Sequence, residues 1–117
     1  MSYAVKLLFY LLLLDAIWIT FFLYQPFSEM IKNVQGSEMS PSLPKTIIAY
    51  IVLYFYIYTF LPKMKDDSEA FMLGFLTYAI YDSTNYATLK NWEGNVAIAD
   101  SLWGGVLFFL LRRLTII

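Results

Sequence analysis

Four long apolar segments constrain the fold of this chain more than any other feature. A helix needs about 20 apolar residues to cross a hydrocarbon layer that is about 30 Å thick. The apolar runs are continuous, whereas the strands of a transmembrane barrel alternate polar and apolar residues over about ten positions. We therefore predict an all-α integral membrane protein, a multi-pass four-helix bundle formed by one domain over residues 1–117. Its helices are expected at about residues 5–24, 44–61, 69–89 and 95–113.

Composition supports a membrane location and excludes several kinds of chemistry. Hydrophobic residues make up 60% of the 117 positions, which is more than the single small core of a soluble domain requires. The net charge of −1, without a basic cluster, excludes nucleic acid as a partner. The chain has no cysteine and no histidine, which excludes thiolate and imidazole chemistry and the usual zinc and haem sites. We expect no cofactor and no metal site.

Short polar turns join the later helices, whereas residues 25–43 form one long connection. Pro26 and Pro62 are expected to end the first and second helices, because proline interrupts the hydrogen-bond pattern of a helix. Residues 27–34 place apolar side chains at helical intervals. This pattern fits either a short helix at the membrane interface or a flexible hydrophilic loop.

The distribution of basic residues predicts which side of the membrane the termini face. With four spans, both termini and the loop at residues 62–68 lie on one side. That side carries five basic residues, Lys6, Lys63, Lys65, Arg112 and Arg113, and the opposite side carries three, Lys32, Lys45 and Lys90. Because cytoplasmic loops are enriched in lysine and arginine, both termini are expected to face the cytoplasm. The sequence does not specify whether the membrane belongs to a cell, an organelle or a virus.

Three acidic residues interrupt three of the apolar segments. Counted from the cytoplasmic side at about 1.5 Å per residue, Asp15, Asp82 and Asp100 lie at depths of roughly 15, 20 and 18 Å. A carboxylate that faced lipid at this depth would cost at least about 3 kcal/mol. We therefore expect the three acids to face one another, a wet cavity or a partner subunit. If they meet, they cannot all carry charge, because repulsion and removal from water both disfavour it.

Hydrogen-bond donors lie near the same depth. Tyr50 and Tyr54 occupy one stripe of the second helix, and Asn85 follows Asp82 by one turn. Trp18 and Trp103 each follow an acid by three residues, so each indole is expected to lean back over the acid of its own helix. The predicted polar layer, or ion or proton site, therefore comprises Asp15, Asp82, Asp100, Asn85, Tyr50, Tyr54, Trp18 and Trp103.

Three glycines are candidates for close helix packing. Gly74 lies in the third predicted helix, and Gly104 and Gly105 are adjacent in the fourth. Small residues let the backbones of membrane helices approach one another closely.

Three motifs in the chain resemble those of a known family. The segment Leu14–Trp18 fits L-D-x-x-W, residues 81–89 fit Y-D-x-T-N-x-A-T-L, and the segment Asp100–Gly104 fits D-x-x-W-G. The chain thereby resembles a family of small four-span membrane proteins of unknown function, found in bacteria and similar to proteins of algae and large algal DNA viruses. The resemblance implies an integral membrane protein without a settled activity. Its motif positions here are Asp15, Trp18, Asp82, Thr84, Asn85, Trp92, Asp100, Trp103 and Gly104.

Three functions remain open at this point. The polar layer could fix helix register in a structural or assembly component of a membrane complex, which is the function we rank first. Alternatively, Asp15, Asp82 and Asp100 could serve an oligomeric channel or transporter for protons or small cations. A lipid-modifying enzyme ranks last, because no nucleophile with an adjacent base is visible, and we expect no catalytic residues. The expected partners are the lipid bilayer and either further copies of the chain or a larger membrane or virion assembly.

Overall fold

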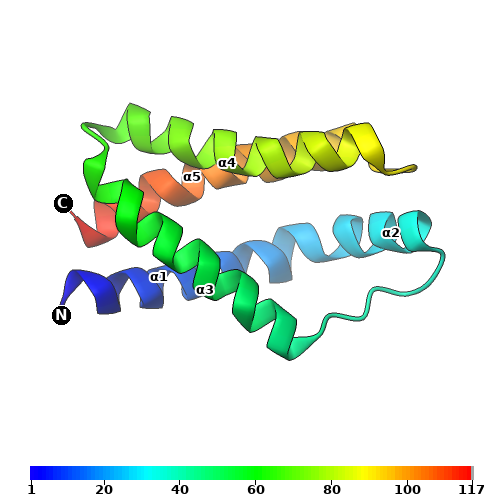
Figure 1. The fold of residues 1–117 in the computed structure, drawn as a ribbon, viewed down its shortest axis with the longest axis horizontal. Helices are drawn as coiled ribbons and strands as arrows, with labels where there is room; N and C mark the ends of the chain where they lie inside the picture. The colour runs from blue at the N-terminus through cyan, green and yellow to red at the C-terminus, as the bar shows by residue number, and fades with distance from the viewer. Residues whose placement is uncertain (117) are drawn as a thin grey trace.

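The structure is a computed structural model that describes residues 1–116, and every regular element in that range is helical (Figure 1). The predicted all-α fold is therefore confirmed. The elements in chain order are α1 (Tyr3–Trp18), the π-helical turn η1 (Ile19–Leu23), α2 (Tyr24–Gln35), α3 (Leu43–Phe60), the short 3-10 turn η2 (Leu61–Lys63), α4 (Asp67–Thr88) and α5 (Gly94–Thr115).

The first helix does not end at Pro26. In the structure α1, η1 and α2 form one helical run of 33 residues, Tyr3–Gln35, so residues 27–34 adopt the helical alternative. The wider π-helical turn lies just before Pro26, where the regular ladder would otherwise meet a residue without an N–H group. The run ends at Gly36, whose backbone is left-handed with φ of 79°. At about 1.5 Å per residue the run is roughly 50 Å long, so it exceeds the hydrocarbon layer.

Three helical runs are long and apolar enough to cross a membrane, namely Tyr3–Gln35, Leu43–Lys63 and Gly94–Thr115. The predicted third span, α4, does not reach the same apolarity, because its second half carries the polar residues 82–85. It lies antiparallel to α5 along its length (Figure 1). We therefore treat α4 as the polar-faced member of the bundle.

Glycines allow α4 and α5 to touch. A Cβ atom added to Gly74 would lie 2.1 Å from the carbonyl oxygen of Gly104, and one added to Gly104 would lie 2.5 Å from the ring of Tyr78. A Cβ atom at Gly105 would meet the ring of Phe71 at 2.7 Å. At each of these three positions a Cβ atom would overlap the neighbouring helix, so glycine allows α4 and α5 to pack closely.

Two apolar clusters lie at opposite ends of the bundle. The cluster near the termini, here the terminal core, contains fully buried side chains from α1, α3, η2, α4 and α5: Leu7, Leu11, Ile57, Leu61, Ala70, Leu107, Phe108 and Leu111. The distal core joins α2 to the start of α5 and contains Met30, Trp92, Val96 and Ala97. The apolar face of α2 therefore packs against protein and does not lie free at the interface.

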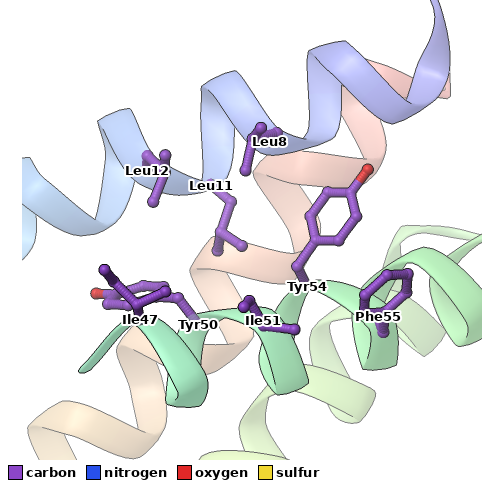
Figure 2. Close-up of a pocket in the computed structure, with 8 residues that line it drawn as sticks. All are labelled: Leu8, Leu11, Leu12, Ile47, Tyr50, Ile51, Tyr54 and Phe55. Carbon is purple, nitrogen blue, oxygen red and sulfur yellow. The ribbon is translucent and has the colours of Figure 1, made fainter. Parts of the chain in front are cut away.

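The α3 helix crosses α1 obliquely, and its first half diverges from α4 and α5 (Figure 1). Tyrosine hydroxyls attach it to its neighbours. Tyr54 donates to the carbonyl oxygen of Ala4 at 2.8 Å, and the hydroxyl of Tyr56 lies 2.9 Å from that of Thr77. Figure 2 shows the apolar groove of about 360 Å³ between α1 and α3, where leucines of α1 face Ile47 and Ile51. This arrangement leaves space beside the first half of α3.

Candidate functional site

Three carboxyl groups lie between the two apolar cores. Asp15 of α1, Asp82 of α4 and Asp100 of α5 are only 7%, 1% and 7% exposed, and they are the buried acids of residues 1–116. Their helices meet at this level because α4 and α5 pack through glycine and α1 packs against α5. We call this level the acid layer.

Asp15 is the fully paired member of the acid layer. The hydroxyl of Tyr50 donates to one carboxyl oxygen, and the indole N–H of Trp103 donates to the other at 3.2 Å. These two bonds connect α1 with α3 and α5. Asp15 thus has a donor for each oxygen and joins three helices at one point.

Trp103 caps the acid of another helix and Trp18 faces one, so the expectation that each leans over its own helix's acid is wrong. Trp103 follows Asp100 but donates to Asp15, while the indole of Trp18 faces Asp100. The two indoles stack on each other with centroids 5.1 Å apart and planes 6° apart. Helix rise fixes the depth of these residues, but the rotation of each helix about its axis decides which acid each indole meets.

Asp82 is the unpaired member of the acid layer. Both of its carboxyl oxygens are buried, and neither has a regular hydrogen-bond partner within residues 1–116. Its carboxyl group is close enough to interact with that of Asp100 and with the indole of Trp92. An unsatisfied buried polar group costs free energy, so a proton shared with Asp100 or a bond from the Trp92 indole would stabilise Asp82, whereas Asp15 already accepts two hydrogen bonds.

Two predicted members of the layer lie elsewhere. Tyr54 bonds to the backbone of Ala4 and so belongs to the contact between α1 and α3. Asn85 interacts with Tyr81 and makes no bond to an acid. Neither residue contributes to the acid layer in this structure.

Two aromatic residues that were left out of the predicted layer are part of it. Tyr78 lies within electrostatic range of all three acids, and its ring packs against Gly104. Trp92 is 6% exposed, faces Asp82 and makes edge contacts with Phe27 and Tyr81. Tyr78 could have been found from its position one turn before Asp82 on the same helix face. Trp92 is one of the motif positions of the resemblance, but it lies in the turn after α4, so helix periodicity does not place it beside Asp82.

Two cavities reach the acid layer. One of about 670 Å³ extends from Asp100, Tyr50 and Tyr81 toward α2 and residues 39–41. Another of about 360 Å³ lies between α4 and α5 and reaches Asp82, Ser83 and Ser101. The larger cavity extends toward the distal core, and the smaller one runs along α4 and α5 from Phe75 past Asp82 to Gly94. On the other side of the layer, the terminal core is closely packed.

The hydroxyl groups beside Asp82 bond to backbone. Ser83 and Thr84 donate to the carbonyl oxygen of Ile80 at 3.4 and 2.6 Å, and Ser101 donates to that of Ala97 at 2.8 Å. Hydroxyls bonded to their own helix are stabilised locally and are not aimed at a neighbouring base. This geometry offers no activated nucleophile at Asp82.

An ion-pair cluster lies at the terminal end of the bundle, where α4 begins and α5 ends. Asp67, at the start of α4, pairs with Arg112 at 2.8 Å and accepts a second bond, at 2.9 Å, from Arg113 at the end of α5. The hydrogen bond from Arg113 and then that from Arg112 hold the pKa of Asp67 below its ordinary value of 3.8. The cluster therefore ties the two helices together at the membrane surface.

Comparison with known proteins identifies the family. The model of the family described as "Predicted membrane protein (DUF2177)" matches residues 1–116. The chain belongs to this family. The family description and the apolar helices both support a membrane location. No curated protein and no solved structure matches the chain.

Proposed function

We propose that the facing carboxyls of Asp82 and Asp100 form a proton-binding site inside the membrane, and that the protein works by taking up and releasing a proton there. The observation that carries this proposal is the unpaired carboxyl group of Asp82, which is 1% exposed and faces a second acid. A shared proton would give the pair a hydrogen bond and remove the repulsion between two charges. Ionisable groups at such depth usually serve a function.

A proton fits this pair better than a metal ion. Hard cations such as calcium and magnesium take six or more oxygen ligands. Within residues 1–116, no group of three or more acidic side chains is arranged to hold a metal ion. Asp15 already uses both oxygens to accept hydrogen bonds from Tyr50 and Trp103. We therefore assign a proton, and not a metal ion, to the pair formed by Asp82 and Asp100.

Access to the pair supports exchange from one side of the membrane. The cavity that reaches Asp100 extends toward α2 and residues 39–41, whereas the terminal core on the other side of the acid layer contains fully buried apolar side chains. With both termini in the cytoplasm, as the basic residues predict, the proton would exchange with the non-cytoplasmic side. Conduction across the whole membrane would require a second route, which an oligomer would have to supply.

Infrared spectroscopy of the protein in lipid nanodiscs tests this proposal, because a protonated carboxyl group has a C=O band that a carboxylate lacks. We expect a pH-dependent carboxyl band that is lost in both Asp82→Asn and Asp100→Asn. Glu38→Gln is the matched control, since Glu38 is an exposed acid outside the bundle. A band that persists unchanged in both Asp variants would overturn the proposal.

An assembly component is the second candidate function, and the pairing of Asp15 favours it. Tyr50 and Trp103 join three helices at this acid, as expected of a polar contact that fixes helix register. The exposed apolar faces of the helices would then meet further copies or other membrane proteins. Cross-linking in native membranes tests this function. If the chain is captured only as a monomer, the assembly role fails, whereas the infrared result for Asp82 is unaffected.

A further inference from the structure

The 670 Å³ cavity has the size of a ligand site, and its wall is mainly apolar. Its apolar side chains come from η1, α2, the connection after α2 and the first half of α3: Ile19, Leu23, Phe27, Met39, Pro41 and Ala49. Ile19, Leu23 and Ala49 of this wall belong to the two helical runs Tyr3–Gln35 and Leu43–Lys63, which are long and apolar enough to cross a membrane. In a membrane, lipid would therefore surround this part of the cavity.

Most polar groups around the cavity already have hydrogen-bond partners. The amide of Gln35 donates to the carbonyl oxygens of Ser37 and Glu38 at 3.1 and 2.8 Å. Thr46 donates to the backbone of Ser42 at 2.8 Å, and Tyr50 donates to Asp15. These groups stabilise the wall and are not available to a ligand.

Unused hydrogen-bonding capacity remains at the inner end of the cavity. Asp100 lines it and is 7% exposed, and within residues 1–116 no regular hydrogen bond reaches its carboxyl oxygens, although the Asp82 carboxyl and the Trp18 indole lie near it. The ring of Tyr81 lies beside it in the same wall. No lysine or arginine lines the cavity, so an anionic headgroup would meet Asp100 without a counter-charge. A cationic headgroup would have to leave water completely to reach this depth, which is costly.

We propose that this cavity binds a neutral lipid with a hydroxyl headgroup, with the hydroxyl at Asp100 and the hydrocarbon chain along the apolar wall. A hydroxyl both donates and accepts, so it can pair with a carboxyl group whether or not that group carries a proton. The ligand enters laterally from the bilayer beside α3. This site has a different wall from the Asp82 cavity.

Photoaffinity labelling in nanodiscs with a diazirine analogue of hexadecanol tests this site. We expect labels on the cavity wall and competition by hexadecanol that is about fivefold stronger than competition by hexadecane, which corresponds to one hydrogen bond. Palmitate and hexadecylamine, which have charged headgroups, should compete less well than hexadecanol. Equal competition by hexadecane, or stronger competition by either charged lipid, would overturn the proposal.

A pair of variants on one helix controls for general effects on lipid contact. Ala49→Trp fills the cavity, whereas Ile48→Trp adds the same ring to the neighbouring position of α3, which is 60% exposed and lies outside this cavity. We expect wall labelling to fall at least about tenfold in Ala49→Trp and to remain in Ile48→Trp. Equal labelling in the two variants would also overturn the proposal. Lipid binding is measured by labelling and proton binding by infrared bands, so each proposal can fail alone.

Discussion

The two ends of this bundle differ in how they are packed. In the terminal core, leucine and phenylalanine side chains are fully buried, and α4 touches α5 through glycine. The distal half has a smaller core and contains the 670 Å³ cavity that reaches Asp100. The acid layer lies at the boundary between them. The acids of this layer also differ from one another, since Asp15 accepts two hydrogen bonds and Asp82 accepts none within residues 1–116. The comparison indicates that one half provides stability and the other provides access.

Gly74→Ala should have the largest effect, because it disrupts the closely packed half. The new Cβ atom would overlap the backbone of Gly104, and overpacking of this kind costs about 1–3 kcal/mol or more. The free energy of unfolding, measured by circular dichroism in detergent, should fall accordingly. Gly94→Ala is the control, since its nearest contact is an ordinary 3.5 Å to the ring of Tyr86. Equal stability of the two variants would mean that the helices do not touch as described.

Tyr50→Phe should have the next largest effect. It removes the donor to one oxygen of Asp15 and leaves a buried acceptor unpaired, at a cost of about 1–2 kcal/mol. Tyr58→Phe serves as control on the same helix, because no hydrogen bond of its exposed hydroxyl is present in residues 1–116. Thermal unfolding of the two variants side by side measures the difference. A wild-type melting temperature for Tyr50→Phe would remove the distinction between the paired and unpaired acids.

Asp82→Asn tests the unpaired acid of the layer, and Asp15→Asn tests the paired one. Because the asparagine amide can donate to the Asp100 carboxyl in place of the shared proton, stability should stay within about 1 kcal/mol of the wild type, or increase, in Asp82→Asn. Asp15→Asn should lower the free energy of unfolding by more, since an amide cannot accept from both Tyr50 and Trp103 in the same way. Chemical denaturation of both variants provides the measurement. A larger loss in Asp82→Asn than in Asp15→Asn would reverse our assignment.

The smallest effect should come from acid pH at the ion-pair cluster. The folded pKa of Asp67 lies below its ordinary 3.8, so the stabilisation is complete above that ordinary value and is lost as pH falls through the folded value. Melting temperature should therefore decline below pH 3.8 more steeply in the wild type than in Asp67→Asn. Parallel slopes for the two proteins would show that the cluster adds no stability. The pair lies at the surface, so the difference should be small.

The sequence predicts the all-α fold, because long continuous apolar runs form helices, and helix rise brings Asp15, Asp82 and Asp100 near one another. The sequence was not sufficient for the contacts between helices. Trp103 was expected over Asp100 and instead caps Asp15, since the rotation of neighbouring helices is decided by packing across the bundle. Pro26 was expected to end a helix that continues through a π-helical turn. Sequence patterns within one helix do not determine how neighbouring helices rotate against one another.

The pairing of indoles with acids gives the protein an optical probe of its own. The chain contains three tryptophans, and each faces a different acid of the layer: Trp103 faces Asp15, Trp18 faces Asp100 and Trp92 faces Asp82. Ultraviolet emission from the unlabelled protein therefore originates almost entirely where charge and hydration of these carboxyls would change. Spectral shifts and quenching can follow that region directly, without a dye or an introduced residue.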